Sequence, residues 1–220
     1  MNDTLLSENV RLRKLVDRYT TLDTLRDTMV HKALTNTDTT VHIVKYADYR
    51  YRTAKVINNS VDGINNYITI DRGAKQGITK GMAVISSTGL VGRVEYVSAN
   101  FASILSILSN KQQVSAKLKD GTFKSTVWDN EHPDVFMMKD MPPELKIKRG
   151  DSVFTTPYGN TFPADVLIGR VAKVELNKKN GKQQLYLTPA TNFRNLQYVY
   201  VIENLMSEER KQLEELPAKK

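Results

Sequence analysis

The 220-residue sequence contains no cysteine. This absence excludes disulfide bonds, thiol nucleophiles and zinc sites with cysteine ligands. The sequence also lacks an apolar run of about 18 residues, the length that a membrane-spanning helix needs. Its first residues lack the basic and apolar regions of a signal peptide. With 40% hydrophobic residues, the chain can nevertheless bury a substantial core.

Local signatures of catalysis are also missing. The three histidines, His31, His42 and His132, do not have the spacing of metal ligands. No H-E-x-x-H, G-x-S-x-G or glycine-lysine phosphate loop occurs. We therefore predict that the protein is not an enzyme and that it uses no cofactor and no metal.

The chain is basic, with a formal net charge of +8. Lysine and arginine alternate with aspartate and glutamate throughout, and the two densest basic stretches, residues 146–149 and 178–182, lie beside glycines in turn-like contexts. No aromatic residues alternate with these stretches to stack on bases. We interpret them as solvated loop charge and expect no nucleic-acid binding. A nucleic-acid-binding β-barrel is the main alternative, and its affinity would fall steeply with salt.

Residues 5–33 show a seven-residue apolar repeat that is typical of a coiled coil. The seam that would form a homodimer consists of Leu5, Leu12, Leu15, Tyr19, Leu22 and Met29. Glu8 and Arg26 interrupt this seam, which weakens association but can fix its register. Polar residues 35–40 end the helix and form a linker, so residues 1–40 are predicted as coiled-coil helix and linker. The alternative is a helix that packs on its own globular domain.

From residue 41 onward, short alternating or apolar runs are separated by turn residues, as in all-β domains. The predicted strands cover residues 51–57, 67–71, 82–86, 89–98, 103–107, 113–118, 122–128, 135–138, 152–155, 168–176, 183–189 and 197–201. Twelve strands fit two small six-stranded β-barrels. The predicted fold class is therefore mainly β, with the coiled-coil helix in front of the barrels.

Two spaced motifs carry a family resemblance. Residues 68–94 contain the run I-x-I-D-x-G-x-x-x-G-I-x-x-G-M-x-V followed by G-L-V-G-x-V, and residues 150–171 contain G-D-x-V-x-T, F-P and I-G-x-V in that order. The motif positions that we expect to shape the turns are Asp71, Gly73, Gly77, Gly81, Gly89, Gly92, Gly150, Asp151, Phe162, Pro163 and Gly169. Asp71 is expected to accept backbone N–H groups in the turn that ends its strand. In both motifs the chain resembles the extracytoplasmic region of the MreC family of bacterial rod-shape-determining proteins.

The resemblance implies two barrels side by side, the second inserted into the first. We expect the first barrel over residues 41–97 plus 171–204, the second over 98–170, and a charged tail over 205–220. Ser207 is predicted to cap a short helix that runs to Leu216 in this tail.

The resemblance also implies a non-enzymatic scaffold of the cell-elongation complex, which controls cell shape by organising and activating peptidoglycan synthesis. The implied partners are penicillin-binding protein 2, MreD, MreB, RodZ and RodA, besides a second copy of the chain. The implied location is periplasmic, on a single-pass inner-membrane protein whose anchor precedes Met1. Exposed strand edges could further join dimers into filaments.

The positions of three aromatic residues in the predicted loops and barrels suggest their roles. Trp128 and Phe162 are predicted to plug the ends of a barrel, whereas Tyr158, in a proline- and glycine-bearing loop, is predicted to be exposed and to bind a partner. The least favoured alternative is a chymotrypsin-like two-barrel peptidase, in which His42 and Asp71 would meet a distant serine such as Ser152. No serine in the sequence has a recognisable nucleophile loop or oxyanion hole around it.

Overall fold

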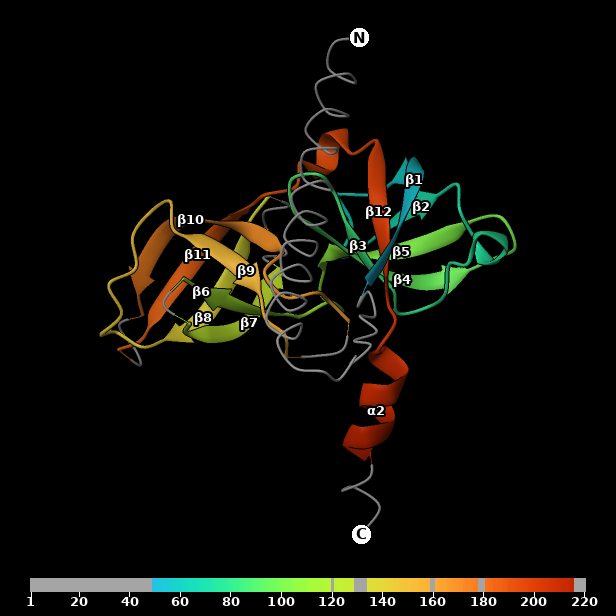
Figure 1. Cartoon of the computed structure of the whole chain (residues 1–220). Helices are drawn as coiled ribbons and strands as arrows, with labels where there is room; N and C mark the ends of the chain where they lie inside the picture. Colours follow the sequence, from blue (N-terminus) through green and yellow to red (C-terminus); the bar gives the residue numbers. More distant parts are fainter. Residues whose placement is uncertain (1–48, 120, 129–133, 159–160, 178–180, 216–220) are drawn as a thin grey trace, which may run out of the picture. The chain divides into compact units, whose positions relative to one another are not determined.

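The computed structural model describes residues 49–119, 121–128, 134–158, 161–177 and 181–215 (Figure 1). The predicted coiled-coil helix and linker, with all six seam residues, lie outside this described part. The same holds for the three histidines and for Leu216. Among the described residues, no helix is long and apolar enough to cross a membrane.

The described chain is mainly β, and its twelve strands form two closed antiparallel barrels (Figure 1). The first barrel contains β1 (Tyr49–Asn59), β2 (Asn65–Ile70), β3 (Ala83–Ile85), β4 (Leu90–Val97), β5 (Ala102–Ser109) and β12 (Tyr198–Asn204). The second contains β6 (Val114–Leu118), β7 (Phe123–Trp128), β8 (Phe136–Met141), β9 (Ser152–Thr155), β10 (Leu167–Leu176) and β11 (Gln183–Pro189). Each predicted strand overlaps one observed strand, so the predicted fold class is confirmed for the described residues.

The order of strands around each barrel depends on long-range pairing. The first barrel closes in the order β1-β12-β3-β4-β5-β2, and the second in the order β10-β11-β8-β7-β6-β9. The second barrel therefore lies between β5 and β12 in the chain. Closure gives each strand two neighbours within the described residues, but these neighbours do not cover its full length: β1 pairs with β12 over residues 49–55 and with β2 only over residues 56–59. The expectation that exposed strand edges join copies into filaments stays a prediction.

The expected barrel boundaries differ from the observed ones. Residues 98–170 were expected to hold only second-barrel strands, but β5 pairs with β2 and β4 of the first barrel. A tight turn, in which the Ser98 N–H donates to the Phe101 carbonyl at 2.8 Å, keeps β5 beside β4. At the other boundary, β10 and β11 pair with each other and with β9 and β8, so residues 171–189 belong to the second barrel.

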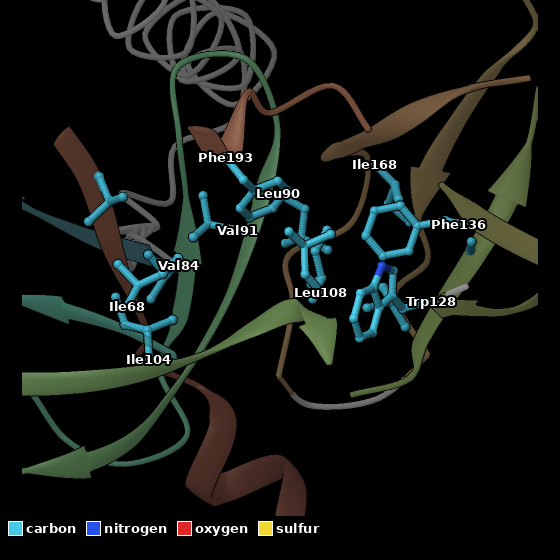
Figure 2. Close-up of a cluster of buried hydrophobic side chains, with 14 of the residues drawn as sticks. Ile68, Val84, Leu90, Val91, Ile104, Leu108, Trp128, Phe136, Ile168 and Phe193 are labelled. Carbon is cyan, nitrogen blue, oxygen red and sulfur yellow. The ribbon is translucent and has the colours of Figure 1, made fainter. Parts of the chain in front are cut away.

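Alternate side chains of the strands point inward and fill the barrel interiors. In β6, for example, Val114, Ala116 and Leu118 are buried, whereas Ser115 and Lys117 between them are partly exposed. Buried side chains of both barrels belong to one continuous hydrophobic cluster. Figure 2 labels members of this cluster from both barrels. Separation of the barrels would therefore expose part of this shared apolar cluster to water.

A buried polar group ties the segment between β11 and β12 to the first barrel. The hydroxyl of Thr191 lies 2.8 Å from the Ser86 hydroxyl and donates to the Leu90 carbonyl at 2.9 Å. Gly89 lies at the same place, where an added Cβ would be 2.5 Å from the Leu167 carbonyl oxygen. These contacts fix the β3–β4 turn against the segment that returns from the second barrel.

Three short helices complete the described chain. Two are single 3-10 turns, η1 (Ala74–Gln76) and η2 (Phe193–Asn195), and the third is α2 (Ser207–Glu215). The predicted tail helix is thus present, but Ser207 does not cap it as an acceptor. The Ser207 hydroxyl donates to the Asn204 carbonyl at 2.8 Å, and the Asn204 side chain accepts from the Met206 N–H at 3.0 Å.

Candidate interaction surface

Two exposed aromatic rings lie in contact on the second barrel. Phe123, the first residue of β7, is 54% exposed, and Tyr158, in the loop after β9, is 60% exposed. Their ring centroids are 5.0 Å apart and the rings are tilted by 43°. Tilted aromatic pairs at this distance attract each other beyond their buried area. The pair is therefore a preformed apolar anchor that faces solvent.

Strand register extends this anchor into a surface. Lys117 in β6 pairs with Phe123 on one side and with Phe154 in β9 on the other, and Phe154 pairs with Leu167 in β10. Cross-strand partners project to the same face of a sheet. We call the outward set of Lys117, Phe123, Phe154, Tyr158 and Leu167 the aromatic surface.

Hydrogen bonds hold the loop that carries Tyr158. Thr156 is buried, its hydroxyl donates to the Ser115 hydroxyl at 2.8 Å, and its N–H donates to the Ser115 carbonyl at 3.1 Å. The Tyr158 N–H donates in turn to the Thr156 hydroxyl at 3.2 Å. From α2, the Arg210 guanidinium donates to the Pro157 carbonyl at 3.2 Å. Tyr158 is thus exposed at its ring but restrained at its backbone.

Three lysines of the β6–β7 hairpin lie at or beside the aromatic surface. The Lys117 ammonium lies 2.7 Å from an Asp165 carboxylate oxygen. The β6–β7 hairpin also carries Lys119 and Lys124, which are exposed and have no ion pair within the described ranges. An apolar centre with a charged rim is the usual anatomy of a protein–protein interface. A partner with acidic residues around an apolar patch would complement it.

The structure confirms the predicted exposure of Tyr158. Trp128 is only 4% exposed and belongs to the hydrophobic core, and Phe162 is partly buried against that core. Sequence reasoning missed Phe123, which stands in a strand rather than in a loop. The only sign of Phe123 in the sequence is an aromatic residue close to the Asp120-Gly121 turn signal. The pairing of Phe123 with Lys117 is what shows that the Phe123 side chain projects outward.

The motif glycines fall into two groups. Gly77, Gly81 and Gly150 have positive φ angles, which side chains rarely adopt. At Gly73, Gly89, Gly92 and Gly169 an added Cβ would overlap a backbone oxygen of another segment. Both groups shape turns or allow close strand approach, as the motifs predict.

The other motif residues stabilise turns and strand ends. Asp151 accepts the Lys148 N–H at 2.8 Å, and the Pro163 carbonyl accepts the Thr155 hydroxyl at 2.6 Å. Asp71 accepts a backbone N–H, but from Lys55 in the neighbouring strand at 2.8 Å and not from its own turn. The expectation that Asp71 accepts from its own turn is therefore wrong. The N–H that Asp71 accepts comes from β1, which lies beside β2 only in the folded barrel.

The peptidase alternative finds no support in the described residues. Asp71 accepts from Lys55 and pairs with Arg72 at 3.2 Å, whereas the Ser152 hydroxyl accepts from Arg170 at 2.9 Å. Each therefore has partners other than a triad histidine. Within the described ranges, no group of three or more histidine, aspartate or glutamate side chains could hold a metal ion.

The fold and the aromatic surface define a double β-barrel domain in which one barrel is inserted into the other and an aromatic anchor is exposed. A family model described as rod shape-determining protein MreC, barrel core, matches residues 56–203. The chain belongs to the MreC family of cell shape-determining proteins.

Curated relatives agree with this assignment. The cell shape-determining protein MreC of Listeria monocytogenes is 31% identical over 159 residues, which cover 70% of this chain and 54% of the relative. MreC of Bacillus subtilis is 27% identical over 206 residues, which cover 89% of this chain and 71% of the relative. The chain thus spans about half the length of the Listeria relative.

Solved structures show the same fold. MreC of Listeria monocytogenes has a TM-score of 0.67 at 27% identity and covers 93% of this chain and 96% of its own. A structure described as the complex between penicillin-binding protein 2 and MreC from Helicobacter pylori has a TM-score of 0.55 at 13% identity, over 71% of this chain and 99% of that one. At that identity the likeness shows the fold alone.

Proposed function

We propose that this chain is a non-enzymatic scaffold of the bacterial cell-elongation complex, which controls cell shape by organising and activating peptidoglycan synthesis through protein–protein contacts. Family membership supports the role in cell shape. The exposed Phe123–Tyr158 pair is the observation that carries the contact function. A few aromatic anchors provide most of the binding energy in many interfaces.

The partner that we propose for the aromatic surface is the periplasmic part of penicillin-binding protein 2. The solved complex of penicillin-binding protein 2 with MreC from Helicobacter pylori supports this choice. A scaffold can activate an enzyme only by binding its active conformation more tightly than its inactive one. The restrained Tyr158 loop suits this task, since a preorganised surface loses little entropy on binding.

Other parts of the proposal rest on the family resemblance. They are contacts with MreD, MreB, RodZ and RodA, homodimer formation through the seam over residues 5–29, and a periplasmic location on an inner-membrane anchor. Assembly of dimers into filaments would use side-chain surfaces or strand lengths that have a paired strand on one side only within the described part, as in β1.

Titration of the chain against purified penicillin-binding protein 2, without its anchor, tests the proposal. We expect saturable binding at physiological salt. Phe123→Ser and Tyr158→Ser should each weaken this binding about 30-fold, which corresponds to about 2 kcal/mol per anchor. The matched control is Tyr96→Ser, because Tyr96 is also 60% exposed but lies on β4 of the first barrel.

Three results would contradict the proposal. If the control variant lost as much affinity as Phe123→Ser, the aromatic surface would not be the binding site. If wild-type chain did not bind the transpeptidase at low or physiological salt, the partner would be wrong. Binding of a short DNA duplex in its place would favour the nucleic-acid alternative.

A further inference from the structure

The first half of β7 has a paired strand on one side only. β7 lies between β6 and β8 in the second barrel (Figure 1). β6 pairs with residues 123–126 of β7, whereas β8 pairs only with residues 126–128. Within the described residues, no strand therefore pairs with residues 123–125 on the side of β8. We call residues 123–125 the open edge of β7.

An irregularity in β8 accounts for the open edge. On its other side, β8 pairs with β11 at Met138, opposite Leu185, and at Met141, opposite Gln183, so β8 contains one extra residue between these two pairs. Asp140, in this bulge, has a φ of 58°, which is unusual for a residue other than glycine. A bulge bends its strand and can end the pairing with a neighbour. β8 thus continues along β11 but parts from β7 after Met138.

The hydrogen bonds of the β6–β7 hairpin give the direction of the backbone groups at the open edge. The Leu118 N–H donates to the Thr122 carbonyl at 2.9 Å. Hydrogen-bonded and non-hydrogen-bonded positions alternate along an antiparallel pair, so the backbone of Lys124 bonds to β6. The N–H groups of Phe123 and Ser125, and the Phe123 carbonyl, point to the other side. All three residues of the open edge are exposed.

The open edge borders the aromatic surface. The Phe123 side chain projects to the same face as Lys117, and the centroid of its ring lies 5.0 Å from that of Tyr158. A strand added beside β7 would place one side chain directly opposite Phe123 on this face, with the two Cβ atoms about 5 Å apart. The added side chain and Tyr158 would then both contact the Phe123 ring. Backbone groups and an aromatic anchor are thus available to a partner at one place.

The charge of the open edge indicates what an added strand would carry. Lys124 lies in the middle of the open edge, and successive side chains of a strand alternate in direction, so Lys124 projects to the face opposite to that of Phe123. Within the described ranges, no carboxylate pairs with Lys124 or with Lys119 in the adjoining turn. An acidic residue opposite Lys124 and an apolar residue opposite Phe123 would complement the open edge.

We propose that the partner protein binds by adding an extended segment, as a further strand, to the open edge of β7. This segment carries an apolar residue opposite Phe123 and an acidic residue opposite Lys124. In strand addition, main-chain hydrogen bonds provide affinity and alternate side chains provide specificity. The step rests on the proposed function, because the partner is the same periplasmic part of penicillin-binding protein 2. It adds the form in which that partner meets the aromatic surface.

Amide hydrogen exchange of the chain, measured by NMR with and without penicillin-binding protein 2, tests strand addition. In the free chain, the Phe123 and Ser125 amides should exchange at least about tenfold faster than the Lys124 amide, because only the Lys124 amide bonds to β6. In the complex, the Phe123 and Ser125 amides should slow by at least about tenfold, because each would donate to the added strand. Contact through side chains alone would not protect both amides in this way.

Two pairs of variants give an independent readout. Ser125→Pro removes an N–H that points away from β6, a position at which a strand tolerates proline, and it should weaken binding about tenfold. Its matched control, Ser125→Ala, keeps the N–H and should bind within about twofold of the wild type. Lys124→Glu should also weaken binding about tenfold, whereas Lys75→Glu, the same change at an exposed position of the first barrel, should change it less than about twofold. If Ser125→Pro proved unstable in urea unfolding, the exchange experiment and the lysine pair would still decide.

Three results would overturn strand addition. Slow exchange of the Phe123 and Ser125 amides in the free chain would show that the edge is already closed. Binding that Phe123→Ser weakens, without protection of these amides, would show contact through side chains alone, and the proposed function would stand without strand addition. Absence of binding at low and at physiological salt would overturn both proposals. The two proposals can therefore be told apart.

Discussion

Replacement of Thr191 by valine should destabilise the fold, because it removes a buried hydroxyl while keeping the shape of the side chain. Thr191 is 2% exposed, and its hydroxyl donates to the Leu90 carbonyl and shares a hydrogen bond with Ser86. Valine deprives both groups of this partner in a place that water does not reach. Loss of a partner for a buried polar group costs about 1–3 kcal/mol.

This cost can be converted into a melting temperature. For a chain of this size, 1 kcal/mol corresponds to about 2–4 °C, so Thr191→Val should lower the Tm by about 2–12 °C. Urea unfolding followed by circular dichroism gives the free energy independently. Thr191→Ser is the matched control, since it keeps the hydroxyl and loses only a methyl group, which should cost about 1 kcal/mol or less.

The opposite ranking of the two variants would refute this reasoning. If Thr191→Val unfolded within about 0.5 kcal/mol of the wild type while Thr191→Ser was clearly less stable, packing of the methyl group would matter and the hydrogen bonds would not. The segment between β11 and β12 would then be held by apolar contacts alone.

Three further predictions concern other parts of the two barrels. Gly89→Ala should destabilise the fold by about 1–3 kcal/mol in urea unfolding, because the added Cβ would lie 2.5 Å from a backbone oxygen. Gly63→Ala is the control and should not destabilise the fold in this way, since no backbone atom would lie closer than 3.5 Å to its Cβ. Equal effects of the two substitutions would argue against the close approach at Gly89. Asn66→Ala should cost at least about 1–3 kcal/mol in the same assay, because the buried Asn66 amide donates to two carbonyls and accepts two hydrogen bonds, and unchanged stability would contradict that role. Lys173→Gln should raise the pKa of Glu175 in an NMR titration, since the Lys173 ammonium lowers that pKa in the wild type. A lowered carboxyl pKa means that the ion pair contributes stability above the ordinary carboxyl pKa, and that this contribution is lost as the pH falls through the lowered pKa. An unchanged pKa of Glu175 in the variant would show that the pair does not form.

The candidate surface was only partly predictable. Tyr158 could be found because a loop with proline and glycine lies at the surface, where aromatic side chains are available to partners. Phe123 could not, because an aromatic residue in a strand faces the core or the solvent according to register. That register is set by pairing with Lys117 and, beyond it, with Phe154.

The loop after β8 shows the same limit. The sequence marks residues 146–149 as basic and turn-like, but it gives no sign of what holds this loop. The Gln183 side chain, in a distant part of the sequence, donates to the Pro143 and Leu145 carbonyls at 2.8 and 3.2 Å. This contact depends on the pairing of β8 with β11, which local patterns do not specify.

Sequence alone determined the number, type and approximate bounds of the strands, because alternation of apolar residues and turn-forming glycines act over a few neighbours. It also determined the family, through two motifs whose glycines are needed for turns and close strand approach. Tertiary structure alone decided which strands share a barrel, where the barrels begin and end, and which side chains meet on their surfaces. Those features depend on hydrogen bonds and packing between residues far apart in the chain, and local patterns do not specify such pairings.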